Sequence, residues 1–256
     1  MKSFALALTA GAVSAITSSE LNYINHLAKF GKDVSDLTEF ETRLARFIEM
    51  DNEIEAHNSQ NGSFTLGHNQ FSDWTHEEYK RLLGYKAEGD HRMNIGRGLK
   101  KPVKRFDTSK NAASEVNWVT AGGVTPVKNQ GVCGSCWAFS TTGSLEGAHF
   151  VAKGELLSFS EQQLVDCAYG TTYGSYGCQG GQPTGAMHYY QYYQADLETT
   201  YPYTSGTDTS TKSCEHDLSE GSAVNVSYYE TVQENNVDQM KAALEQQPLS
   251  VLIQAD

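Results

Sequence analysis

The cysteines restrict the fold of this chain more than any other residue type. All five lie in the second part of the 256-residue sequence, at positions 133, 136, 167, 178 and 214. In an exported chain, an odd number of cysteines indicates disulfide pairs plus one free thiol. We therefore expect two disulfide bonds and one free cysteine, all of them after residue 130.

The first two cysteines form a Cys-x-x-Cys pair, which allows three interpretations. It can be a redox centre, half of a zinc site, or one disulfide cysteine beside one free thiol. A zinc site would require a second such pair at suitable spacing, and the sequence has none. A thioredoxin-like centre would require a surrounding βαβ pattern, which is also missing. We favour the third interpretation and expect no metal and no cofactor.

Residues 1–15 indicate export. Lys2 provides a positive start, and a mostly apolar stretch leads to small residues at Ala15, as in a secretory signal peptide. No later apolar run reaches the roughly 18 residues that a membrane span needs. We therefore expect entry into the secretory pathway and no membrane anchor.

The charge divides the chain into two parts. Residues 1–111 carry 15 basic and 15 acidic side chains, whereas residues 112–256 carry 4 basic and 16 acidic ones, which accounts for the whole net charge of −12. An acidic balance disfavours nucleic acid as a partner, because phosphate binding needs a basic face.

Apolar periodicity and turn residues predict the secondary structure. Two helices are expected within residues 19–58, separated near residues 33–36, and a helix should start near residue 75. The other expected helices cover residues 136–151, 160–167 and 185–195, with one more ending before Pro248. Short strands are expected at residues 62–73, 228–232 and 249–254. A cleavable linker is expected at residues 86–110, and a glycine-rich loop at residues 170–183.

Cys136 has the features of a nucleophile. It stands at the start of a predicted helix, where the positive end of the helix dipole favours the thiolate. A thiolate can attack an amide carbonyl with little further activation.

Three motifs together resemble one known family. The first runs from Gln130 to Trp137 and reads Gln-Gly-Val-Cys-Gly-Ser-Cys-Trp. The second is spaced along the long predicted helix, with Met50 as a departure, and the third follows it. Both lie in the first part of the chain, at Glu39, Arg43, Phe47, Ile54 and Asn58, and at Gly67, Asn69, Phe71 and Asp73. The chain resembles papain-like cysteine proteases of the cathepsin L type, with an inhibitory prosegment.

The resemblance implies an α+β fold: a papain-like two-lobe protease, with a helical lobe and an incomplete β-barrel lobe, preceded by a helical inhibitory prosegment. It divides the chain into a signal peptide at residues 1–15, a prosegment with its linker at 16–111, and a catalytic domain at 112–256. The prosegment is expected to lay its linker backwards through the cleft, and Asp73 to respond to acid.

The resemblance also implies roles for individual residues. Cys136 would be the nucleophile, and the side-chain amide of Gln130 would stabilise the oxyanion. Glycines 180 and 181 would line the cleft, and Pro183 and Leu252 would wall a pocket that prefers an apolar substrate side chain. The implied disulfides are Cys133–Cys178 and Cys167–Cys214.

The family's catalytic His and Asn follow the nucleophile by roughly 130–150 residues, whereas the chain ends at Asp256. We expect a C-terminally truncated endopeptidase zymogen that is inactive as given. The alternative is an inhibitor or pseudoenzyme that acts through its prosegment. The expected partners are protein or peptide substrates and the chain's own prosegment. A monomer in a lysosome-like or vacuole-like compartment, or outside the cell, is expected.

Overall fold

The computed structural model describes residues 16–85, 103–109, 113–217, 222 and 224–253. The predicted signal peptide at residues 1–15 and most of the predicted linker, residues 86–102, lie outside this part. The chain forms two compact units, and the division between them falls after Tyr79.

The N-terminal unit consists mainly of two helices, α1 (Ser18–Phe30) and α2 (Leu37–Asn58). A reciprocal capping box between Thr17 and Glu20 starts α1, and the side chain of Asp36 accepts the Glu39 N–H at the start of α2. Tyr23 of α1 is fully buried against Phe47 of α2. Both helices confirm the prediction. A short helix, α3 (His76–Lys80), follows and also matches the predicted start.

The strand predicted at residues 62–73 does not form. The alternating Phe64 and Leu66 meet no neighbouring strand in the described part of the chain, and Phe64 is 61% exposed. Instead, the side chain of Asn58 bonds both the N–H and the carbonyl of Leu66, at 2.8 and 2.9 Å. An alternating pattern forms a strand only where a second strand can satisfy its backbone groups.

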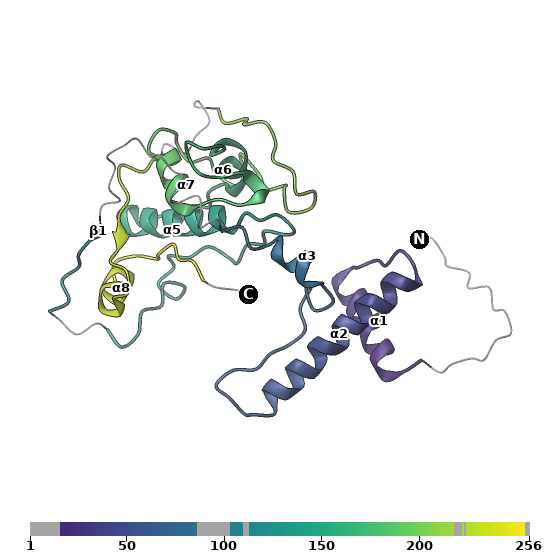
Figure 1. The fold of residues 1–256 in the computed structure, drawn as a ribbon. Helices are drawn as coiled ribbons and strands as arrows, with labels where there is room; N and C mark the ends of the chain where they lie inside the picture. The colour runs from purple at the N-terminus through teal and green to yellow at the C-terminus, as the bar shows by residue number, and fades with distance from the viewer. Residues whose placement is uncertain (1–15, 86–102, 110–112, 218–221, 223, 254–256) are drawn as a thin grey trace. The chain divides into compact units, whose positions relative to one another are not determined.

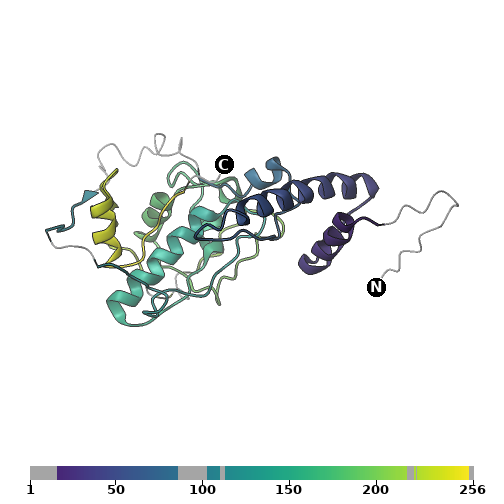
Figure 2. The same ribbon diagram turned by 90° about the horizontal axis from the view of Figure 1, so that it is seen from below.

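The C-terminal unit is built around helix α5 (Cys136–Lys153). Helices α6 (Glu161–Cys167) and α7 (Pro183–Tyr190) pack against α5, whereas α8 (Val237–Leu244) lies apart from them (Figures 1 and 2). A one-turn helix, η2 (Gly177–Gln179), packs on α6. Two short parallel strands, β1 (Val103–Lys104) and β2 (Thr231–Val232), pair Val103 with Thr231.

The core of this unit fixes the start of α5. Trp137 is fully buried and belongs to the same core cluster as Phe159, Leu164 and Tyr190. Its indole N–H donates to the carbonyl of Gly177 at 3.2 Å. Because a buried tryptophan contributes several kcal/mol to a core, its neighbour Cys136 is held in one place.

Three elements differ from the prediction. Helix α7 begins at Pro183, before the predicted residue 185, because proline suits the first turn of a helix, and it ends at Tyr190, short of the predicted residue 195. Strand β2 covers only the end of the predicted 228–232. Residues 249–253 form no strand; Ser250 instead exchanges a hydrogen bond with Ser140 of α5 at 2.7 Å.

Candidate active site

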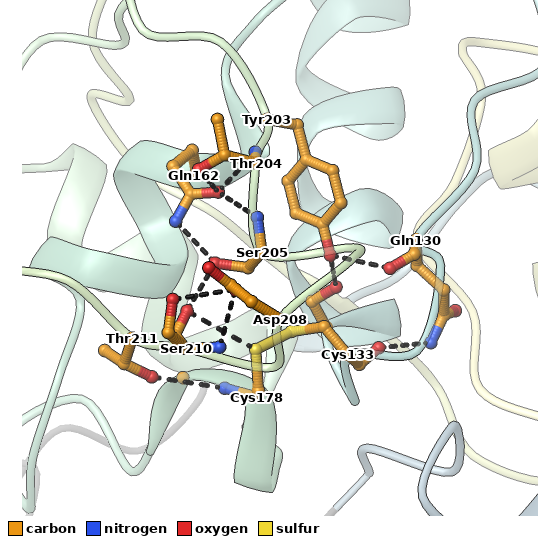
Figure 3. Close-up of a disulfide and its surroundings, with 12 residues drawn as sticks. Gln130, Cys133, Gln162, Cys178, Tyr203, Thr204, Ser205, Asp208, Ser210 and Thr211 are labelled. Carbon is orange, nitrogen blue, oxygen red and sulfur yellow. Dashed lines mark hydrogen bonds between the residues drawn. A yellow bond between two sulfur atoms is a disulfide. The ribbon is translucent and has the colours of Figure 1, made fainter.

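Cys136 is the free cysteine, and it is the first residue of α5. The other four form Cys133–Cys178 and Cys167–Cys214, the two pairs that the family resemblance implies. The first bond ties η2 and the glycine-rich loop to the turn before α5 (Figure 3). In addition, the Gly134 N–H donates to the carbonyl of Cys178 at 3.0 Å.

Tyr203 holds the loop that carries Gln130. Its hydroxyl donates to the backbone carbonyl of Gln130 at 2.8 Å and lies 2.7 Å from the hydroxyl of Ser135 (Figure 3). The side-chain amide of Gln130 donates to the carbonyl of Cys133 at 2.8 Å. These bonds fix the amide of Gln130 beside the turn that leads into Cys136.

Residues 82–85, which we call the covering segment, lie on this turn. The amide of Gln130 donates to the carbonyl of Leu82 at 3.1 Å, and the Gly181 N–H donates to the carbonyl of Gly84 at 2.8 Å. Tyr85 pairs with Gly181 in a parallel bridge. The carbonyl groups of the covering segment therefore accept hydrogen bonds from two predicted donors of the site, the Gln130 side-chain amide and the Gly181 N–H.

Gly84 is needed for this close approach. A Cβ at residue 84 would overlap the carbonyl oxygen of Gly134 and lie 2.5 Å from its carbonyl carbon. Any larger residue would push the covering segment away, because both surfaces are backbone.

Gly180 has a different role. Its N–H donates to the carbonyl of Gly177 and its own carbonyl accepts the Tyr176 N–H, so it closes η2.

The surroundings of Cys136 change the expected protonation state of its thiol. Burial raises the pKa of the Cys136 thiol, although the backbone N–H groups of Gly84, Trp137 and Cys136 itself lower it. The sequence predicted a thiolate from the helix start alone. In this covered state burial outweighs the helix dipole, and the thiol is the favoured form.

The predicted pocket residues lie at two places. Pro183 is buried at the start of α7. Leu252 is 46% exposed and follows Val251, whose carbonyl accepts from the hydroxyl of Ser140 at 3.3 Å. Ser140 lies one turn after Cys136 on α5, so this bond ties the chain next to Leu252 to the helix that carries the nucleophile.

The described histidines of the C-terminal unit have partners other than Cys136. His149 lies 3.8 Å from Glu155, and His188 bonds Gln191 at 3.0 Å. His216 is buried and bonds Asp196 at 2.7 Å. The structure thus assigns none of these three rings to the nucleophile.

Sequence reasoning missed a buried charge cluster next to Gln130. The ammonium of Lys128 donates to Glu146 at 2.8 Å, to Glu161 at 2.7 Å and to the carbonyl of Phe159 at 3.0 Å. Burial raises the pKa of Glu161 to about 7, against the effect of Lys128. The cluster anchors the Gln130 loop on α5 and α6. One signal in the sequence could have revealed this cluster: Lys128 is one of only four basic residues after residue 111.

The remaining sequence motifs lie together in the N-terminal unit. Arg43 pairs with Glu39 at 2.8 Å and with Glu78 at 3.0 Å. The carboxylate of Asp73 is buried, pairs with Lys32, and accepts the Tyr23 hydroxyl at 3.2 Å.

Other motif residues support the same unit. Phe47 and Ile54 are buried on α2. The side chain of Asn69 accepts the Phe71 N–H at 2.8 Å, and the ring of Phe71 packs on Trp74. Gly67 is different, because a Cβ there would meet nothing within 4 Å; the structure gives no steric reason for glycine at this position.

Two negative findings apply to the described residues only. No group of three or more His, Cys, Asp or Glu side chains there is arranged to hold a metal ion. No helix in that part is both long enough and apolar enough to cross a bilayer.

Comparison with known proteins gives two family matches. Residues 112–256 match the papain family of cysteine proteases, and residues 23–79 match the cathepsin propeptide inhibitor domain. Among structures, the chain is similar to digestive procathepsin L 3 of Tenebrio molitor, at 28% identity and a TM-score of 0.74, over 90% of this chain and 71% of that one. This structural similarity and the two family matches support the predicted α+β papain-like fold with a propeptide.

Curated relatives agree. Cysteine proteinase 5 of Dictyostelium discoideum is 40% identical over 79% of this chain and 55% of its own length. Digestive cysteine proteinase 1 of Homarus americanus is 41% identical over 74% of this chain and 58% of its own. A cathepsin L-like protein of Caenorhabditis elegans is 34% identical over all of this chain and 77% of its own. The chain thus spans little more than half of the first two relatives. With a matching catalytic domain, a matching propeptide domain and a free cysteine at the expected helix start, the chain belongs to the papain family of cysteine proteases.

Proposed function

We propose that the chain is part of a cysteine endopeptidase zymogen, in which Cys136 attacks the peptide carbonyl carbon. The C–N bond breaks, the amine leaves with a proton from a general acid, and water then hydrolyses the thioester. The amide of Gln130 and the backbone N–H of Cys136 stabilise the oxyanion. Removal of one such donor costs roughly 3 kcal/mol of transition-state stabilisation.

One observation carries this proposal: the side-chain amide of Gln130 already holds a peptide carbonyl, that of Leu82, beside the start of α5. A substrate carbonyl at this place would face the same donor. The Gly181 N–H likewise holds the carbonyl of Gly84, so it can align a second peptide group of a substrate.

The same contacts support autoinhibition by the chain's own prosegment. The covering segment accepts hydrogen bonds from the donors that a substrate needs, and the Gly84 N–H bonds the thiol of Cys136. It pairs with Gly181 in the parallel direction, which agrees with the expected backward path. Removal of the segment would free the donors and lower the pKa of the thiol by exposing it.

Two finer points belong to the proposal. The enzyme is expected to prefer an apolar side chain at the second residue before the scissile bond, because Pro183 and Leu252 are apolar and the covering segment places Tyr85 beside Gly181. The general base is expected to be a histidine, and none of the three described histidines of this unit bonds Cys136. We therefore expect residues 1–256 alone not to turn over substrate.

An inhibitor of related proteases is the second candidate, because the N-terminal unit is compact by itself. The test uses protein expressed from the natural transcript, activated by acid and assayed with fluorogenic peptide amides. Endopeptidase function predicts turnover that Cys136→Ala abolishes and that Gln130→Ala lowers about 100-fold in kcat. Inhibition of a related protease without any turnover would favour the second candidate, and turnover by Cys136→Ala would refute the mechanism.

A further inference from the structure

Ser135 stands directly before α5 but does not cap it. A serine in this place usually accepts the N–H of the second or third helical residue with its hydroxyl. The residues before α6 and α8, Ser160 and Asn236, do form such a bond. Ser135 forms none, and its backbone, at φ −102° and ψ 14°, lies outside the extended conformation of an ordinary N-cap. The first N–H groups of α5 therefore have no side-chain cap.

The hydroxyl of Ser135 bonds Tyr203 instead. The Tyr203 hydroxyl donates its hydrogen to the Gln130 carbonyl at 2.8 Å, so the Ser135 hydroxyl is the donor in the 2.7 Å bond between the two side chains. Ser135 is fully buried, and a buried hydroxyl needs a partner. The Ser135 N–H also donates to the carbonyl of Cys133 at 2.8 Å. These two bonds hold Ser135 in its non-capping conformation.

Tyr203 is itself held by α5 and α6. The buried side chain of Gln162 on α6 accepts the N–H groups of Thr204 and Ser205 at 2.8 and 3.0 Å (Figure 3). The ring of Tyr203 packs edge-on against that of Phe139 on α5, with centroids 4.9 Å apart. The position of the Tyr203 hydroxyl is thus set by the two helices and does not depend on its bond to the serine.

The uncapped N–H groups of α5 serve the thiol. Those of Cys136 and Trp137 bond the sulfur of Cys136 and lower its pKa, as does the Gly84 N–H. Trp137 is the second residue of α5, so its N–H is one of the two that a capping serine would take. Such a bond stabilises a thiolate more than a neutral thiol. No charged side chain of the described part is among the causes that act on this pKa.

We propose that Tyr203 is a positioning residue for the nucleophile: by holding the Ser135 hydroxyl, it keeps the Trp137 N–H available to the sulfur of Cys136. The inference rests on the proposed role of Cys136. Without the Tyr203 hydroxyl, Ser135 would be free to turn to the extended conformation and cap α5, and the sulfur would lose a donor. Since the same hydroxyl bonds the Gln130 carbonyl, one group positions both the nucleophile and the residue proposed for the oxyanion.

The test measures the rate at which iodoacetamide alkylates Cys136 in the folded full chain between pH 7 and pH 9. Alkylation needs the thiolate, and the pKa of this thiol is raised above 9.0, so the rate follows the thiolate fraction. Loss of one hydrogen bond to the thiolate should make Tyr203→Phe react roughly tenfold more slowly. A loop that merely loosened would expose the thiol and react faster. Tyr201→Phe is the matched control, because its hydroxyl bonds Asp166 at 3.1 Å, and it should react at the wild-type rate.

A double variant tests the route through Ser135. Tyr203→Phe combined with Ser135→Ala has no hydroxyl that could cap α5, so its alkylation rate should return to that of the wild type. A wild-type or faster rate in Tyr203→Phe, or a slow rate that persists in the double variant, would overturn the proposal. The measurement needs no turnover. If the slow rate and its recovery are found in a protein that hydrolyses no peptide, the endopeptidase function fails and the positioning role of Tyr203 remains.

Discussion

Replacement of Gly84 by alanine should uncover the nucleophile. A Cβ at residue 84 would overlap the carbonyl oxygen of Gly134 and lie 2.5 Å from its carbonyl carbon, so the covering segment must move by more than about 1 Å to reach ordinary contact distance. Two hydrogen bonds depend on the present position, from the Gly181 N–H to Gly84 at 2.8 Å and from Gln130 to Leu82 at 3.1 Å. At about 0.5–1.5 kcal/mol for each bond, the covered state loses about 1–3 kcal/mol.

This loss corresponds to an increase of about 5- to 150-fold in the uncovered fraction. Cys136 is the free thiol of the chain, since the other four cysteines form disulfides, so its alkylation by iodoacetamide reports uncovering directly. Gly143→Ala is the matched control, because a Cβ at this exposed position of α5 meets nothing within 4 Å. Equal labelling rates for folded Gly84→Ala and wild type would refute the assignment of the covering segment.

Three further predictions concern the C-terminal unit. Replacement of both Cys133 and Cys178 by alanine removes a disulfide bond that spans 45 residues. By loop entropy this should lower the free energy of unfolding, measured in urea, by about 4 kcal/mol. An unchanged free energy of unfolding would argue against the bond. Tyr203→Phe removes the hydroxyl that bonds the Gln130 carbonyl and should cost about 1 kcal/mol, with faster amide exchange in the loop around Gln130; unaltered exchange would count against this anchor. Because the pKa of Glu161 is raised to about 7, the folded state binds the extra proton, so stability should fall as the pH rises from about 4.5 to about 7, by at most about 3 kcal/mol. Glu161→Gln should remove that dependence in thermal unfolding, and its persistence would place the proton elsewhere.

Local signals in the sequence were sufficient for most helices. Helix α5 begins at Cys136, as predicted, and Ser160 caps α6 by accepting the Gln163 N–H. The side chain of Gln163 does not complete a reciprocal capping box, because its Oε1 atom accepts the Asp196 N–H while the Ser160 N–H donates to the carbonyl of Asp196. Caps and apolar periodicity are properties of neighbouring residues, which explains why they can be read from one sequence.

Contacts between distant residues could not be predicted in the same way. The donor of Gln130 meets the carbonyl of Leu82, 48 residues away. The pKa of the Cys136 thiol is raised by burial, which a helix start in the sequence does not reveal. The strand expected at residues 62–73 failed for a related reason, since pairing depends on a partner strand elsewhere in the chain.

The central claim is that Cys136 forms the acyl intermediate of peptide hydrolysis. The most direct test mixes acid-activated protein, expressed from the natural transcript, with a slowly hydrolysed peptide ester and stops the reaction within its first turnover. Mass spectrometry should find the acyl group on the peptide that contains Cys136, and Cys136→Ala should carry none. An acyl group on another residue, or turnover that persists in Cys136→Ala, would contradict the account.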